Sequence, residues 1–486
     1  MTADQIMEAQ TMNADDAGRA YPVRLPGEGE GHQVPGPAER VAVDFEGPGA
    51  GVEELTWGQW SLWEAMTRHG SWMPLGGAKR LEAGVSVQDV AEELRYLVSR
   101  NPSMRTRLRF GPESAPRQEL FGAGTVFLEV HDVAEDAEPD GTAAAVEAHY
   151  RHTPFDFADD WPVRMGVVRR HGELTHMVVV MCHLVTDAAG ARVMLREVEA
   201  RTTAPPEGMQ QLEQARWQRS EAGRRQGGRA LRYHEKLLTA LAPQNAPGAS
   251  DPRSPRYWTA EFRSRALRPA AGALARRTGA TASTVLTALH AISLARVTGA
   301  HPVVMRPLVG NRFRPGLAEV VCMLTQPGLC VLDVADTTVD DAVGRVRRSV
   351  LSAYKYGYYD PRQLADLVDR VARERGPGFS VSCMFNDRRD ESAAAPAAGP
   401  LTREQLRAAR ERSGFRWADR TDKPSERMFL TVEDEPDGIL LRFAADTHHF
   451  PPALFEALLR GIENLAVRAA LDPAATTGVT STGKGR

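Results

Sequence analysis

The sequence has little cysteine, and the arrangement of its cysteines excludes the usual metal and disulfide patterns. Its 486 residues include four cysteines, Cys182, Cys322, Cys330 and Cys383, with no CxxC pair and no zinc-site spacing. Cys182 and Cys383 lie in apolar runs typical of strands. We therefore expect reduced, mostly buried thiols and a cytoplasmic protein.

Other absences exclude whole classes of partner. The formal net charge of −3 gives no broad basic surface, so nucleic acid is not an expected partner. No apolar run approaches the ~20 residues that a membrane span requires, so we expect no membrane partner. The first residues, MTADQIMEAQ, contain neither the basic nor the apolar part of an export signal.

The length of the chain leaves room for two or three lobes of ~100–200 residues each. Residues 1–42 are rich in Gly, Pro and acidic side chains, which predicts a disordered leader. We divide the remainder near residue 215, inside a charged region with few core residues, into an N-terminal lobe (43–215) and a C-terminal lobe (216–472). Residues 473–486 are mostly Ala, Thr and Gly, which predicts a flexible tail.

Strand-like and helix-like patterns alternate along the chain. Val85–Ser99 has apolar residues at a helical period, and Leu267–Arg296 contains two helical runs separated near Gly279. Apolar β-forming runs occur at Thr125–Val130, His176–Cys182, Pro302–Met305, Leu329–Val334, Phe379–Phe385 and Ile439–Ala444. This alternation predicts a mixed α/β protein with helices packed against its sheets.

The most informative stretch is MVVVMCHLVTDAAG, residues 177–190. An apolar strand ends at Cys182 and His183, Asp187 follows four residues later, and a helical pattern begins at Ala188. Such a strand presents the imidazole at the end of a sheet, where a ligand can reach it. Histidine is also the side chain whose ordinary pKa suits proton exchange near neutrality.

This stretch resembles the HHxxxDG core motif of nonribosomal peptide synthetase condensation domains, with Cys182 in place of the first histidine and Ala188 in place of the glycine. Five further blocks resemble that family in the family's order, over about residues 50–470. They are LTWGQWSLWEAM (55–66), SRNPSMRTRLRF (99–110), PFDFADDWPVRMGVVR (154–169), VVMRPLVGNRFRPGLAEVVCMLTQPGLCVLDV (303–334) and MFLTVEDEPDGILLRFAADTHHF (428–450).

The resemblance implies a fold and a set of partners. It implies two lobes similar to chloramphenicol acetyltransferase, arranged as a V-shaped pseudo-dimer with an active-site tunnel at the lobe junction. Substrates would arrive as thioesters on the phosphopantetheine of carrier proteins or on coenzyme A, with no cofactor bound by the chain itself. The acceptor would be a small amine or alcohol, and we expect a monomer.

The resemblance also assigns the motif residues. His183 is the candidate catalytic residue, because an imidazole beside the attacking atom can take its proton or orient it. Asp187 invites interpretation as an orienting group for His183, but the family's aspartate pairs with an arginine. Here that arginine is Arg312 or, with a one-residue shift, Arg306. We expect a structural ion pair.

Two further residues near the motif have a structural interpretation. Cys182 is either a reactive thiol or a packing residue, and we favour packing because strand neighbours alternate faces and no cation besides His183 adjoins it in sequence. Arg105 is either a surface charge at a helix end or, as the resemblance implies, an arginine fixed beneath the active-site loop.

Gln326 and Asn386 are candidate substrate-binding residues. Each lies in a strand-like segment near the expected tunnel and either orients an acyl carbonyl or serves as a packing amide. We expect no metal site, since the adjacent His448 and His449 face opposite ways on an extended chain. The C-terminal GVTSTGKGR lacks the strand, Ser/Thr and helix of a phosphate-binding loop.

The leading hypothesis is a freestanding condensation enzyme, because the sequence shows no carrier-protein serine motif, adenylation loop or GxSxG elbow. It would transfer a carrier-bound acyl or aminoacyl thioester to an amine or alcohol in natural-product biosynthesis, with carrier proteins supplied in trans. Two alternatives stay open. One is an acyltransferase that uses acyl-CoA, and the other is a catalytically degenerate docking protein.

Overall fold

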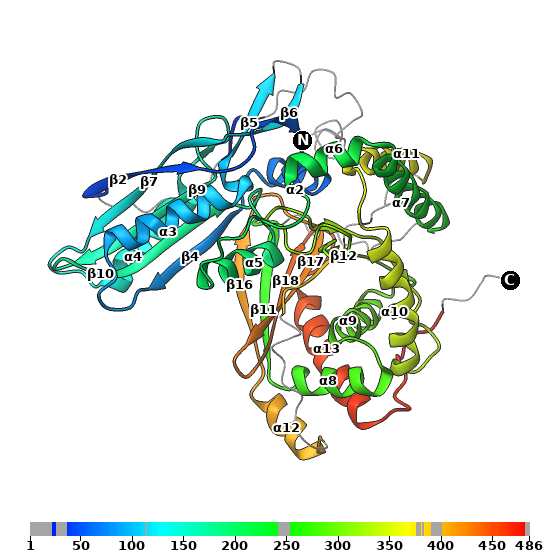
Figure 1. The fold of residues 1–486 in the computed structure, drawn as a ribbon. Coiled ribbons are helices and arrows are strands. Elements are labelled where there is room, and N and C mark those ends of the chain that lie inside the picture. The colour runs from blue at the N-terminus through cyan, green and yellow to red at the C-terminus, as the bar shows by residue number, and fades with distance from the viewer. Residues whose placement is uncertain are drawn as a thin grey trace. The chain divides into compact units, whose positions relative to one another are not determined.

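The computed structural model describes residues 22–25, 36–111, 114–241, 253–375, 381, 383–389 and 401–481. The chain forms two compact units (Figure 1), which are described separately. Unit 1 contains residues 1–227, 310–326 and 360–362, and unit 2 contains the rest. The mixed α/β class predicted from the sequence is confirmed.

Unit 1 is built on a five-stranded sheet in the order β2-β7-β9-β10-β4. Its strands are β2 (Glu39–Glu46), β4 (Pro74–Arg80), β7 (Ala123–Asp132), β9 (Val163–Arg170) and β10 (Glu173–Cys182). β7 and β9 run parallel and the other neighbouring pairs run antiparallel.

The strand that carries the histidine motif is buried on both faces. Met177, Val179 and Met181 point into one core with α3 (Val87–Arg100) and α5 (Ala188–Glu199). Val178, Val180 and Cys182 point into the other core with α2 (Trp57–His69) and α4 (Pro139–His152). Apolar residues at every position from Met177 to Cys182 are what a strand covered by helices on both sides requires.

Smaller elements complete unit 1. A three-stranded sheet has the order β3-β6-β5, and β1 pairs with β8. The bounds are β1 (Arg24–Leu25), β3 (Gly51–Glu54), β5 (Thr106–Gly111), β6 (Ser114–Leu120), β8 (Phe155–Asp156), a 3₁₀ turn (Pro102–Arg105) and α6 (Gln211–Arg219). The next helix, α7 (Glu221–Ala240), continues from unit 1 into unit 2.

Unit 2 contains a sheet in the order β12-β15-β17-β18-β11-β16, with β14 paired to β12. The strands are β11 (Tyr257–Ser264), β12 (Val303–Val309), β14 (Cys330–Leu332), β15 (Cys383–Asp387), β16 (Gly414–Thr421), β17 (Met428–Glu435) and β18 (Gly438–Asp446). Strand β13 (Gln326–Pro327) lies where the chain passes from one unit to the other.

Helices cover one face of the unit 2 sheet and enclose its core. These helices are α8 (Leu267–Thr278), α9 (Ala282–Thr298), α10 (Val339–Lys355) and α13 (Ala453–Leu471), while α11 (Pro361–Arg375) packs with α7 and α12 (Arg403–Glu411) precedes β16. The apolar surface of α9 is buried, as its all-round apolar sequence predicts.

Among the described helices, none is long and apolar enough to cross a membrane alone. Only α8 and α9 together reach that length and composition, with a 107° bend between them.

The units divide the chain differently from the expected boundary near residue 215. The change of unit falls between Gly227 and Gly228, inside the continuous helix α7. Residues 310–326, expected in the C-terminal lobe, belong to unit 1. The charged composition of α6 hid its buried residues, which include Leu212 and Ala215.

The two expected flexible ends are ordered in part. Within the expected leader, β1 pairs with β8, and β2 begins at Glu39. Residues 1–21 and 26–35 lie outside the described residues. In the expected tail, Ala475 and Val479 are buried in the core of unit 2, and Arg296 Nε donates to Thr477 O at 2.6 Å. Small residues there fit against a packed surface that composition alone does not reveal.

Val479→Asp should lower the melting temperature of the protein, while Thr480→Asp should leave it nearly unchanged. Val479 is 8% exposed and packs in the core of unit 2, whereas Thr480 is exposed. Losing a buried valine and burying a carboxylate costs at least about 2 kcal/mol, or several degrees for a unit of this size. Thermal unfolding by circular dichroism measures both variants, and equal melting temperatures would show that the tail does not stabilise unit 2.

Candidate active site around His183

His183 follows β10 directly and is half-buried in unit 1. Its Nδ1 lies 3.0 Å from the backbone carbonyl oxygen of Thr186. Because a carbonyl oxygen only accepts hydrogen bonds, Nδ1 carries the hydrogen. The neutral ring therefore has its lone pair on Nε2, which is the atom that can take a proton from a substrate.

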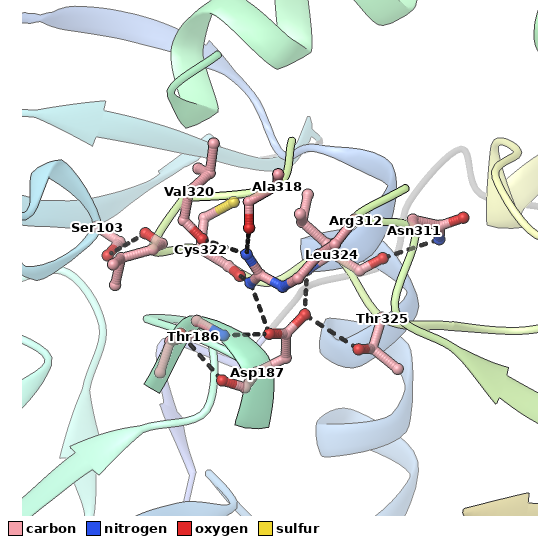
Figure 2. Close-up of polar contacts among 12 residues, drawn as sticks. Ser103, Thr186, Asp187, Asn311, Arg312, Ala318, Val320, Cys322, Leu324 and Thr325 are labelled. Atoms are coloured by element: carbon pink, nitrogen blue, oxygen red, sulfur yellow. Dashed lines mark hydrogen bonds and ion pairs between the residues drawn. The ribbon is translucent and has the colours of Figure 1, made fainter. Parts of the chain in front are cut away.

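Asp187 occupies the N-cap of α5, and its carboxylate receives four donors (Figure 2). Oδ1 accepts from Gly190 N at 2.9 Å and from Arg312 Nη2 at 2.7 Å. Oδ2 accepts from Leu324 N at 3.2 Å and from Thr325 Oγ1 at 3.0 Å. A carboxylate with both oxygens committed in this way is held in place by its own chain. It is not the group that orients His183, whose Nδ1 bonds to Thr186.

Arg312 completes a buried ion pair with Asp187. The two side chains are 14% and 4% exposed, and the guanidinium also donates to Val320 O at 2.6 Å and Ala318 O at 3.3 Å. These bonds pair the two charges and give both Nη atoms of Arg312 acceptors. The alternative partner, Arg306, lies in β12 of unit 2.

Residues 310–326 are fastened to unit 1 by further contacts that sequence patterns did not indicate. Ser103 Oγ donates to Val321 O at 3.0 Å, and Gln214 Nε2 lies 3.2 Å from Cys322 Sγ. The approach at Gly190 is close, because a Cβ there would lie 2.2 Å from Thr186 Oγ1 and 2.8 Å from Arg312 Nη2. A side chain at position 190 would force Thr186 or Arg312 to move.

Cys182 points away from the candidate site. It is fully buried in the core shared with α2 and α4, and its Sγ donates to Trp72 O at 3.6 Å. Burial raises the pKa of the Cys182 thiol to about 12. A thiol held protonated in a core is a poor nucleophile.

Arg105 is fully buried, which excludes its interpretation as a surface charge. Its guanidinium donates to the backbone oxygens of Pro48 at 2.9 Å, Gly47 at 3.4 Å and Phe121. Burial lowers the pKa of this group. These contacts fix the chain between β2 and β3, and none of them is to the histidine loop.

The two candidate substrate-binding residues lie in different units. Gln326 is buried at the end of the unit 1 segment 310–326, and Asn386 lies in β15 of unit 2. Asn386 follows Phe385, which points into the core, so it faces the side of the sheet away from that core. Their roles stay predictions.

Within the described residues, no three His, Cys, Asp or Glu side chains are placed to share a metal ion. His448 Nε2 lies 3.1 Å from Arg253 O, and His449 Nε2 lies 3.7 Å from Asp446 Oδ2. The last five residues of GVTSTGKGR lie outside the described residues.

In unit 1, a cavity of about 20 Å³ beside Cys182, Gln59 and Thr106 has room for about one water molecule.

The chain is similar to known proteins in sequence and in fold. Residues 57–419 match the model of the family described as Condensation domain. The phosphinothricin tripeptide synthetase PhsC of Streptomyces viridochromogenes is 25% identical over 336 residues, 64% of this chain and 30% of that protein. The chain spans 30% or less of the length of the curated relatives compared.

Solved structures share the fold at low sequence identity. The condensation domain of the monacolin K polyketide synthase MokA has a TM-score of 0.66 and 16% identity, covering 89% of this chain and 100% of the other. The X-domain from teicoplanin biosynthesis has a TM-score of 0.63 and 18% identity, covering 88% and 97%.

Asp187→Ala should destabilise the protein, because it leaves the Arg312 guanidinium buried without its counter-ion, at roughly 3–5 kcal/mol when burial is complete. Arg312→Ala should do the same, and the double variant should lose less than the sum of the two. Chemical denaturation of the three variants measures this coupling. An Asp187→Ala protein as stable as the parent but slower would instead place the carboxylate in the chemistry.

Cys182→Ala and Cys182→Ser should keep most of the activity of the parent, and thiol alkylation should inhibit little. The reason is that the buried, protonated sulfur faces the core rather than His183. Product formation under saturating substrate measures the first effect, and mass spectrometry measures the second. An acyl group trapped on Cys182 would contradict this and would require an acyl-enzyme route.

Proposed function

Since this chain belongs to the condensation-domain family, we propose that it joins an acyl or aminoacyl unit to an amine or alcohol acceptor. The acyl unit is held as a thioester on the phosphopantetheine of a carrier protein. The likeness to a tripeptide synthetase supports this placement in nonribosomal natural-product biosynthesis. The chain itself needs no bound cofactor for this reaction.

The hydrogen bond from His183 Nδ1 to Thr186 O is the observation that carries the proposal. It fixes the tautomer whose Nε2 accepts a proton, on a half-buried residue at the end of a strand. A positioned imidazole typically contributes ~10²–10⁴-fold to a proton transfer. A thioester is reactive enough that further acid–base groups are not required.

The proposed step conserves atoms and charge. The acceptor nitrogen or oxygen attacks the thioester carbonyl carbon, the new C–N or C–O bond forms, and the C–S bond breaks. The acceptor's proton passes to Nε2 of His183 and then to the departing pantetheine sulfur. Asp187 takes no part in the transfer, because its oxygens already accept from Gly190, Arg312, Leu324 and Thr325.

A second candidate function is docking without catalysis. The first histidine of the family motif is Cys182 here, and an X-domain is among the structural neighbours. One solved complex contains that X-domain with OxyB. Inertness toward carrier-bound thioesters and coenzyme A thioesters, together with tight protein binding, would favour this candidate. Turnover of simple acyl-CoA would favour an acyltransferase of the wider group.

His183→Ala should lower product formation by about 10²–10⁴-fold without unfolding the protein, because a general base is lost from a half-buried loop. Intact-protein mass spectrometry of a loaded carrier protein, incubated with enzyme and acceptor, measures the rate. His171→Ala is the matched control, since His171 lies exposed in the turn between β9 and β10. Rates near the parent's in His183→Ala, at saturating carrier, would remove His183 from the chemistry.

A further inference from the structure

Helix α7 has one buried face and one cationic face. Ala230, His234 and Leu238 are at most 1% exposed in unit 2, and burial lowers the pKa of His234 to about 4, so its imidazole is neutral. The opposite face carries exposed cations at Arg225, Arg229, Arg232 and Lys236, called the cationic stripe below. At ~100° per residue these four lie within a sector of ~60° and extend over ~16 Å.

Most of the cationic stripe lacks an ion pair within the part of the chain that the structure describes. Arg225 pairs with Glu221, but no described carboxylate pairs with Arg229, Arg232 or Lys236. The nearest acidic residue in sequence, Glu235, pairs with Arg370 of α11 at 2.7 Å. Cations three and four residues apart repel one another, so the stripe reduces the stability of α7 as long as nothing neutralises it.

We propose that the cationic stripe is a docking surface for a carrier protein that presents a row of carboxylates on one helix. Carboxylates three, four or seven residues apart on a helix repeat at ~5–6 Å, which matches the spacing of the cations. Complementary charge of this kind steers association and fixes the register of two proteins. The inference rests on the proposed function for the identity of the partner.

A protein fits the surface better than a nucleic acid or a membrane. The stripe is one helix face with four cations, and the whole chain has a formal net charge of −3. Extended polyanions would meet that overall negative charge beyond the stripe, whereas a small acidic protein contacts the stripe alone. Binding to duplex DNA or to anionic vesicles in place of carrier protein is therefore an outcome that overturns the proposal.

The test compares Arg229→Glu/Arg232→Glu/Lys236→Glu with Arg403→Glu/Arg407→Glu/Arg410→Glu. The second triple lies on exposed positions of α12, over the same length of helix and with the same change in net charge. Binding of apo carrier proteins at low and high salt is measured by calorimetry. We expect Kd to rise about ten-fold or more in the α7 triple only, and the salt dependence of binding to become weaker.

Chemistry is measured separately with a short acyl-pantetheine thioester that needs no docking. We expect the α7 triple to keep the parent's rate with this substrate and to lose rate only with carrier-bound substrate. If the parent turns over neither substrate, the proposed function is contradicted. The docking surface is then tested by the binding measurement alone. Equal weakening in both triples, or no carrier binding by the parent at low salt, overturns the docking surface.

Discussion

The geometry of the candidate site depends on one carboxylate, that of Asp187. It caps α5, pairs with Arg312 and accepts from Leu324 N and Thr325 Oγ1. These contacts join the histidine loop to residues that follow it in the chain by more than a hundred positions. Removing such a charge from water is expensive, and only a full set of donors offsets that cost. The carboxylate therefore determines which chain segments must lie together.

The loop that carries His183 is held at several points as a result. Val185 N donates to Cys182 O at 3.0 Å, His183 Nδ1 bonds to Thr186 O, and Asp187 fixes the start of α5. A histidine whose tautomer and orientation are set before substrate arrives loses little freedom when it works. Asp187 therefore has a structural role and His183 the proposed chemical role. The position of His183 depends on the contacts that Asp187 makes.

Local patterns predicted the elements better than they predicted the packing between distant segments. The apolar run of β10, the helical period of α3 and the break between α8 and α9 each reflect a single element, so a short window of sequence contains them. The resemblance gave Asp187 an arginine partner, Arg312 or Arg306, and the contact with Arg312 is present. Assigning residues 310–326 to unit 1 requires long-range contacts, such as that of Ser103 with Val321, which no window contains.

The same distinction applies to the chain ends and to Arg105. Composition predicted a free tail, yet Ala475 and Val479 are small enough to pack beside the core of unit 2. For Arg105 the sequence left a surface charge and a fixed arginine as alternatives, and the backbone oxygens of Gly47, Pro48 and Phe121 accept its hydrogen bonds in a buried position. Every residue has a backbone carbonyl that can accept a hydrogen bond. The residue types in a sequence therefore do not show which carbonyls will bind a buried arginine.

The cysteine at position 182 has a physical explanation in the packing of β10. Position 182 shares its face with Val178 and Val180, and that face is closed by the core of α2 and α4. The adjoining cavity, of about 20 Å³, has room for about one water molecule. An imidazole is larger than a thiol and has two polar nitrogens that would need partners. A cysteine fills this site as a small apolar residue. Cores select residues by volume and hydrogen-bond satisfaction, so a cysteine at 182 suits the core behind the loop, while His183 is half-buried and lies outside that core.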